Sequence, residues 1–301
     1  MTDARFDALR STRAERPAAV LEAAGARRRR PFLDESRRLL LVAADHPARA
    51  ALSVRADPLA MADRYGLLDR LLVALSRPGV DGVLATADIV EDLLILGALE
   101  DKVVVGSMNR GGLQGASFEL DDRFTAYDAE TIEAMGLDGG KMLCRIALGD
   151  PGSLATLESC GKAVTELARR RRVAMIEPFM SVSTDGRTTN QLTAEAVIAS
   201  VAVAAGLGAV SAYTWLKLPV VDQMDRVMAA TTLPTVLLGG DPTERPDETY
   251  AAWERALCLP GVHGLVVGRA LLYPPDGDVA AAVDIAASLV RPTTERAPTA
   301  P

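Results

Sequence analysis

The run AVSAYTWLKLPVV, residues 209–221, is one of eight short apolar runs that decide the fold. Its apolar side chains do not alternate with polar ones, so a strand over 209–217 would be apolar on both faces. A helical pattern follows over 220–231. Strands of this kind, each followed by a helix, are typical of a parallel sheet that helices cover on both sides. Lys217 is the one charged residue inside this run.

The same unit of strand and helix recurs along the chain in both directions. The predicted strands are 39–44, 82–86, 102–107, 139–146, 172–178, 209–217, 234–239 and 262–267, and the predicted helices are 61–76, 88–98, 151–170, 192–206, 220–231 and 246–258. Eight units favour an α/β fold that closes as a (β/α)8 TIM barrel over an open sheet. No GxGxxG follows the first strand, which argues against a dinucleotide-binding fold.

One barrel domain, residues 31–290, accounts for most of the chain. Residues 1–30 are predicted to be a helical extension, with an extra N-terminal helix over 1–28 that caps the barrel floor. The end, RPTTERAPTAP at 291–301, has the composition of a disordered tail. The long glycine-bearing connection at 107–128 follows the third strand, and such connections face the active site of a barrel.

Composition excludes several classes of protein. A net charge of −7 and a pI near 5.1 argue against a nucleic-acid partner. Three cysteines in 301 residues are no disulfide framework and fit a reduced compartment. The charged N-terminus lacks the apolar core of a secretory signal, and no apolar run approaches the roughly 20 residues of a membrane span. We therefore expect a cytoplasmic protein with no membrane partner.

Lysine is rare in this chain, which draws attention to Lys141 and Lys217. Only four of the 33 basic residues are lysines, and these two lie inside apolar strands, the fourth and the sixth. Alternate strands contribute to one side-chain layer of a barrel, so the two amines can meet. Burial and a second cation lower a lysine pKa from ~10.4 towards about 7–8, which yields the neutral amine that attacks a carbonyl. The structural alternatives are a lysine that reaches solvent at 217 and an ion pair of Lys141 with Asp45 or Glu177.

Other strand ends supply the groups that Schiff-base chemistry needs. Asp45 follows the first strand and Glu177 ends the fifth, where a carboxylate can move protons and orient the amines. The seventh and eighth strand ends predict a phosphate site, as these loops commonly do in barrels; its residues are Gly239, Gly240, Gly268 and Arg269. Cysteine and histidine spacing suggests no zinc, and we expect no metal.

Six short motifs, in this order and spacing, resemble the class I aldolases of the DeoC/FbaB type. They are LVAADHP (41–47), KML (141–143), IEPF (176–179), WLKLPV (215–220), LLGGD (237–241) and VVGRALLY (266–273). The resemblance covers residues 38–290 and is nearest to the tagatose-1,6-bisphosphate aldolase branch and to actinobacterial aldolase-like barrels found with inositol-catabolism genes. It implies that Lys217 forms the Schiff base, with Lys141, Glu177 and Asp45 beside it. The sequence departs from the family pattern at DHPAR, at Asn109-Arg110 and just after GRA. These positions face the non-reacting end of the substrate, so the departures concern the identity of the substrate.

The implied activity is that of a cofactor-free lyase, an aldehyde-lyase of the class I aldolase type, on a phosphorylated keto sugar or keto acid. Dihydroxyacetone phosphate would be one product, and 5-dehydro-2-deoxy-6-phosphogluconate of inositol catabolism is a candidate substrate. The carboxylate of its aldehyde product, malonate semialdehyde, would suit Arg110 or Arg145. A homo-oligomer is also expected. Three alternatives stay open: a deoxyribose-phosphate-type aldolase, an FMN-dependent barrel oxidoreductase and a non-catalytic homologue that senses sugar phosphates.

Overall fold

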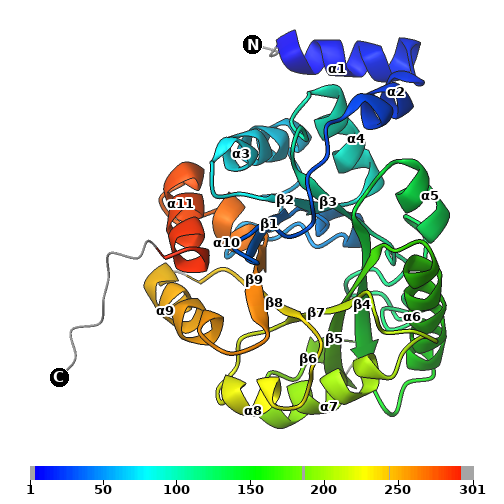
Figure 1. Ribbon diagram of the computed structural model, residues 1–301, viewed down its shortest axis with the longest axis vertical. Helices are drawn as coiled ribbons and strands as arrows, with labels where there is room; N and C mark the ends of the chain where they lie inside the picture. The colour runs from blue at the N-terminus through cyan, green and yellow to red at the C-terminus, as the bar shows by residue number, and fades with distance from the viewer. Residues whose placement is uncertain (1–3, 185–186, 244, 293–301) are drawn as a thin grey trace.

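Eight parallel strands close into a barrel in the computed structural model, which describes residues 4–184, 187–243 and 245–292. They are β1 Leu39–Ala43, β2 Gly82–Ala85, β3 Val103–Ser107, β4 Gly139–Ile146, β5 Val173–Thr184, β7 Thr214–Leu218, β8 Thr235–Leu238 and β9 Val262–Val267. Pairing of β1 with β9 and of β4 with β5 completes the ring (Figure 1). The predicted (β/α)8 TIM barrel is confirmed; β7, β8 and β9 are its sixth, seventh and eighth strands.

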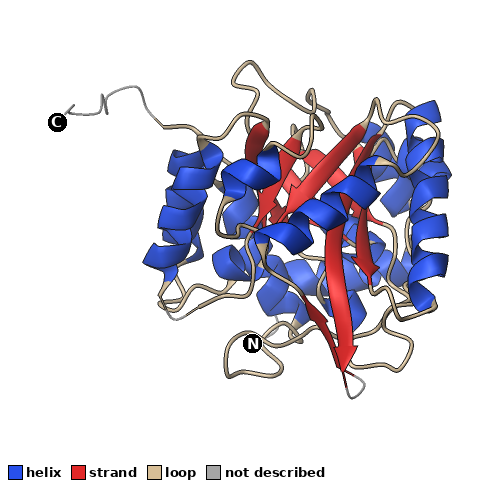
Figure 2. Ribbon diagram, turned by 90° about the horizontal axis from the view of Figure 1, so that it is seen from below, coloured by secondary structure: helices blue, strands red, loops and turns tan. Residues whose placement is uncertain are grey.

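Helices surround the strands on the outside of the barrel (Figure 2). They are α3 Arg64–Ser76, α4 Ala87–Ile95, α5 Ala129–Ala134, α6 Gly152–Arg169, α7 Ala194–Ala205, α8 Met224–Met228, α9 Pro246–Leu257, α10 Arg269–Leu272 and α11 Val279–Val290, with a short 3-10 turn, η1, at Pro47–Arg49. Each of the six predicted helical stretches overlaps one of them, while α5, α10 and α11 lie outside those stretches. None of the helices in the described residues is long and apolar enough to cross a bilayer.

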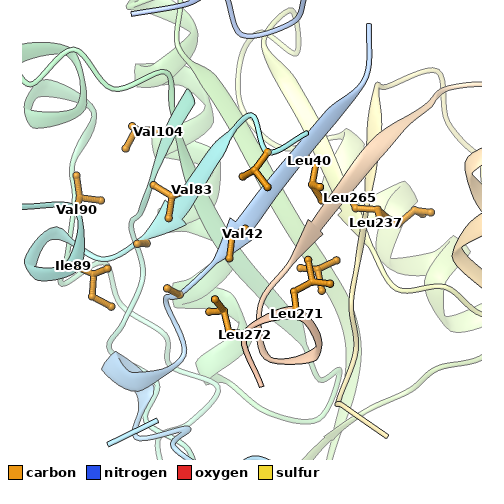
Figure 3. Close-up of a cluster of buried hydrophobic side chains, with 14 of the residues drawn as sticks. Leu40, Val42, Val83, Ile89, Val90, Val104, Leu237, Leu265, Leu271 and Leu272 are labelled. Carbon is orange, nitrogen blue, oxygen red and sulfur yellow. The ribbon is translucent and has the colours of Figure 1, made fainter. Parts of the chain in front are cut away.

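Side chains along each strand point alternately inward and outward, because successive residues of a strand face opposite sides. Leu40 and Val42 of β1 face the helices and belong to the large outer core (Figure 3). Leu39, Leu41 and Ala43 belong instead to a second cluster inside the barrel, with Val105 of β3, Met175 of β5 and Trp215 of β7 among its members. This interior cluster ends where the strands end. The next inward positions are polar: Asp45, Ser107, Glu177 and Lys217.

Two helices, α1 Ala4–Glu15 and α2 Ala19–Ala26, precede the barrel where one was predicted. Pro17 lies at the break, since proline lacks the N–H group that a continuous helix requires. Both helices lie outside the barrel beside α3 and α4 (Figure 1), and Arg13 bonds to Asp92 of α4 at 2.6 Å. Phe32 and Leu33 are the residues that pack against the interior cluster. Phe32 meets Trp215 edge-on, with 5.1 Å between ring centroids.

A hairpin extends β5 beyond the barrel, which the sequence did not predict. β5 continues to Thr184 and pairs antiparallel with β6, Arg187–Asn190, so that the hairpin projects from the end at which the barrel strands finish (Figure 2). At the other extreme of the chain, residues 293–301 of the predicted tail lie outside the described residues. Arg291, its first residue, is fixed to the barrel through Asp81 at 2.7 Å.

Candidate active site

Lys217 lies at the end of β7 and points into the barrel. Its two-residue spacing from the inward-facing Trp215 puts both side chains on the same face of the strand. The residue is only 4% exposed, so it does not extend to solvent as a surface lysine would. Its Nζ donates to Oε1 of Glu177 at 2.8 Å. The ammonium is therefore buried and has one carboxylate partner at hydrogen-bond distance.

Lys141 binds the other oxygen of the same carboxylate. Its Nζ contacts Oε2 of Glu177 and also donates to Oδ2 of Asp45 at 3.1 Å. The structure thus brings together the four residues that the sequence singled out for chemistry, from β1, β4, β5 and β7. The ion pair expected under the structural alternative for Lys141 is present with both carboxylates. A purely structural ion pair of Lys141 does not, however, explain why Lys217 is also bound to Glu177.

Arg110 and Ser107 complete this group of contacts from the end of β3. The guanidinium of Arg110 forms an ion pair with Asp45, and its Nε donates to Oγ of Ser107 at 2.9 Å. Ser107 in turn donates to Oδ2 of Asp45 at 3.1 Å. We call the connected residues Asp45, Ser107, Arg110, Lys141, Glu177 and Lys217 the lysine cluster. Each of its members is at most 8% exposed.

Electrostatics within the lysine cluster keep both carboxylates ionised. Burial alone would raise the pKa of Glu177, but the charges of Lys141 and Lys217 lower it to about 2. Burial acts in the same direction on Asp45, and there Arg110 and Lys141 hold the pKa well below its usual range. Burial lowers the pKa of Lys141, against the two carboxylates that raise it. Since burial opposes every charge in this cluster, each one depends on its partners.

The predicted phosphate-binding residues lie at the ends of β8 and β9. Gly239 and Gly268 have no room for a side chain, because a Cβ would lie 2.5 Å from Val267 and 2.4 Å from the Ala43 carbonyl oxygen, respectively. Gly240 has a φ of +67° and open space around it. Arg269 forms an ion pair with the exposed Asp241. Packing within the barrel thus accounts for glycine at 239 and 268, whereas Gly240 borders open space. These positions are separate from the contacts of the lysine cluster.

His46, next to Asp45, joins the two regions. A Cβ on Gly268 would lie 2.8 Å from the His46 ring, and Nδ1 of His46 is a buried atom without a hydrogen-bond partner in the described structure. Burial lowers the pKa of His46 to about 3; Asp45 opposes this shift and Arg269 adds to it. The imidazole is therefore neutral, and it adds no charge to the site.

Arg145 does not reach the lysine cluster. It forms an ion pair with Glu119 and also donates to the Glu119 carbonyl oxygen at 2.7 Å. Arg49 makes the equivalent contacts nearby: it pairs with Asp122 and donates to the carbonyl oxygens of Asn109 and Gly112 at 2.6 and 2.7 Å. Both arginines thus hold the connection between β3 and α5 in place. Sequence reasoning missed Arg49, Glu119 and Asp122, since nothing in their spacing indicates which charges pair.

A metal site is not evident among the residues that the structure describes. No three histidine, cysteine, aspartate or glutamate side chains gather there as metal ligands would. Asp45 and Glu177 face lysine and arginine nitrogens instead. The cations that neutralise these carboxylates are therefore side chains of the chain itself.

Comparison with known proteins identifies the family. The family model described as Cgl0159-like matches residues 37–287. The chain belongs to the Cgl0159-like family. The crystal structure of Cgl0159 from Corynebacterium glutamicum is 57% identical over 96% of this chain and 98% of that chain, with a TM-score of 0.94. No curated protein matches the sequence.

More distant structures share the fold of this Cgl0159-like chain. An archaeal fructose 1,6-bisphosphate aldolase is 16% identical with a TM-score of 0.64, over 90% of this chain and 98% of the other. A Schiff-base-forming fructose-1,6-bisphosphate aldolase is 17% identical with a TM-score of 0.64, over 90% and 99%. At this identity the likeness shows a common barrel.

Proposed function

We propose that this Cgl0159-like protein is a class I aldolase, which cleaves a carbon–carbon bond in a phosphorylated keto sugar or keto acid through a Schiff base on Lys217. One observation carries the proposal: two buried lysines contact the two oxygens of a single buried carboxylate, at the barrel end where active sites lie. Clustered buried ionisable groups of this kind mark functional sites. The fold shared with Schiff-base-forming fructose-1,6-bisphosphate aldolases supports the same reaction class.

A count of charges favours Lys217 as the nucleophile. The lysine cluster holds three cations, on Arg110, Lys141 and Lys217, against the two carboxylates of Asp45 and Glu177. Loss of one proton removes the excess, and buried unpaired charge is costly. Lys141 contacts two carboxylates and Lys217 one, so a covalent bond to the substrate at Lys217 disturbs fewer ion pairs than one at Lys141. The neutral amine left by the loss of a proton is the form that attacks a ketone.

In the proposed cleavage, the Lys217 amine adds to the ketone carbon and loses water to form an iminium. The bond between the next two carbons breaks, and its electron pair moves towards the iminium to give an enamine. Glu177, which starts as a carboxylate because its pKa is about 2, accepts the hydroxyl proton of the carbon that becomes the aldehyde. It then returns a proton to the enamine carbon. Water hydrolyses the iminium, which releases the ketone product and restores Lys217.

Lys141 and Asp45 support this sequence by position. Lys141 bridges Asp45 and Glu177, so it fixes the carboxylate that moves protons and its ammonium can bind a substrate oxygen. The phosphate is proposed to bind at Gly239, Gly240, Gly268 and Arg269. With dihydroxyacetone phosphate as one product, 5-dehydro-2-deoxy-6-phosphogluconate of inositol catabolism is the candidate substrate.

Borohydride trapping tests the nucleophile. Incubation with dihydroxyacetone phosphate and sodium borohydride is expected to leave a reduced adduct on the peptide that contains Lys217, as read by peptide mass mapping. The adduct should vanish in Lys217→Met and persist in Lys162→Met, which changes an exposed lysine on α6. No adduct on the wild type, or one on Lys141 alone, rejects the assignment. An adduct with acetaldehyde but none with dihydroxyacetone phosphate would favour a deoxyribose-phosphate-type aldolase.

A further inference from the structure

Arg110 differs from Arg145, the other arginine with an expected role at the substrate, because it belongs to the lysine cluster. Its Nε and Nη2 are held by Ser107 and Asp45, and its side chain is 6% exposed. No hydrogen bond to Nη1 is present among the described residues. One edge of this buried guanidinium is thus committed to the cluster, and the other edge retains donors for a ligand.

The charge of the lysine cluster during the proposed reaction calls for an anion. An iminium on Lys217 keeps the positive charge that the ammonium had, so the excess of one cation over the carboxylates of Asp45 and Glu177 returns in the covalent intermediate. An unpaired buried charge is costly. An oxyanion of the substrate beside Arg110 would remove that excess when the intermediate forms.

The position of Arg110 in the barrel indicates which part of the substrate it meets. Around the closed ring β3 is four strands from β8 in either direction, so the end of β3 lies across the barrel from the end of β8. The proposed phosphate site spans the ends of β8 and β9, which are four and three strands from β3 around the ring, and Lys217 lies near the end of the strand adjacent to β8, β7. A substrate held by its phosphate at β8 and by its ketone at Lys217 extends its remaining carbons away from β8, towards the side on which Arg110 lies.

We propose that Arg110 binds an oxyanion, a carboxylate or a phosphate, on the half of the substrate that leaves as the aldehyde. The enzyme then selects aldehydes that carry negative charge. The planar guanidinium suits such a group, because its parallel N–H donors can bind two oxygens of one carboxylate or phosphate. This inference rests on the proposed aldolase reaction and adds to it the chemical class of the second product.

Aldol synthesis with dihydroxyacetone phosphate tests the selection. Three three-carbon acceptors differ in charge: malonate semialdehyde, glyceraldehyde 3-phosphate and neutral propanal. The wild type is expected to have a higher kcat/KM for one of the two anionic aldehydes than for propanal. Which of the two it prefers shows whether Arg110 binds a carboxylate or a phosphate. Arg110→Met should lower the kcat/KM for the preferred anion about 10- to 100-fold more than it lowers the value for propanal, because this ratio is the size of one charged hydrogen bond. Arg110→Lys should fall between them.

Two controls separate recognition from support of Asp45. Arg123→Met alters an exposed arginine in the same segment and should change no acceptor. Exchange of a dihydroxyacetone phosphate carbon-bound hydrogen with deuterium needs the enamine but no acceptor, so in Arg110→Met any fall in its rate should be much smaller than the fall for the charged acceptor. Equal losses for charged and neutral acceptors, loss of exchange, or a wild type without preference for an anion overturns the inference. A wild type that shows no exchange and no trapped adduct rejects the aldolase proposal itself, and the inference with it.

Discussion

Glu177 is held as a carboxylate by two buried ammonium groups, and this has a consequence for stability in acid. Its pKa falls from an ordinary 4.5 to about 2, because Lys141 and Lys217 outweigh burial. A depressed carboxyl pKa stabilises the fold above the unfolded value, and that stability is lost as pH falls through the folded value. The free energy of unfolding should therefore fall between pH 4.5 and 2, with on the order of 3 kcal/mol due to Glu177.

Urea unfolding at a series of pH values measures this contribution. Glu177→Gln should show a shallower decline in that window than the wild type. Glu158→Gln, which alters an exposed pair with Lys162, should follow the wild-type curve. Parallel curves for the wild type and Glu177→Gln would mean that the lysines do not stabilise this carboxylate.

For single residues, the sequence could predict where a side chain lies in the barrel better than it could predict which residue that side chain pairs with. Lys141 and Lys217 were recognisable because lysine is rare here and both lie in strands whose neighbours are apolar. Strand periodicity then indicates that they point inward. The pairing of Arg145 with Glu119 could not be predicted, because 24% of the residues are charged and pairing across loops follows no period. The same reason left Arg145 as a substrate candidate.

Among the elements, the connection between β3 and α5 depends on two buried ion pairs. Arg145 with Glu119 and Arg49 with Asp122 are each at most 9% exposed on either side. Removal of one partner of a buried pair leaves an uncompensated charge, so Arg145→Met should lower the free energy of unfolding by about 3–5 kcal/mol. The double variant Arg145→Met with Glu119→Leu should recover most of that loss, because it leaves no charge unpaired.

Equilibrium denaturation of the two single variants and the double variant forms a complete cycle. Lys162→Met, which breaks the exposed pair with Glu158, is the control and should cost less than about 1 kcal/mol. A double variant as unstable as the sum of the singles would show that Arg145 and Glu119 act independently. In that case the connection would be held by other contacts, such as those of Asn109 with the Leu143 backbone.

The strands that the sequence predicted are those whose environment is uniform along their length. Eight were found because an interior strand of a barrel is apolar on both faces. The extension of β5 and all of β6 were missed because their residues are polar and outside the barrel, as the exposed Thr184 and Thr189 show. A sharper signal was present: Asp185-Gly186 between two such segments is a sequence typical of hairpins.

Over the whole molecule, the barrel divides stability and chemistry between its two ends. Strand β7 carries one residue that stabilises the barrel and one that belongs to the candidate active site, and the two are only two positions apart. Trp215 packs with Phe32 at the floor, and Lys217 lies in the lysine cluster at the other end. The interior cluster needs the volume of the indole, whereas the lysine cluster already has more cations than carboxylates. Substitutions at these two positions should therefore have opposite effects.

Trp215→Ala is expected to lower the free energy of unfolding by about 3–5 kcal/mol, because it leaves a cavity in the barrel interior. Below its melting range it should still form the borohydride adduct. Lys217→Met should form none, yet stay within about 1 kcal/mol of the wild type or exceed it, because it removes the surplus buried charge. Guanidinium unfolding followed by circular dichroism measures both. A loss in Lys217→Met as large as that in Trp215→Ala would show that this lysine holds the barrel together, and the charge count that assigns it as the nucleophile would fail.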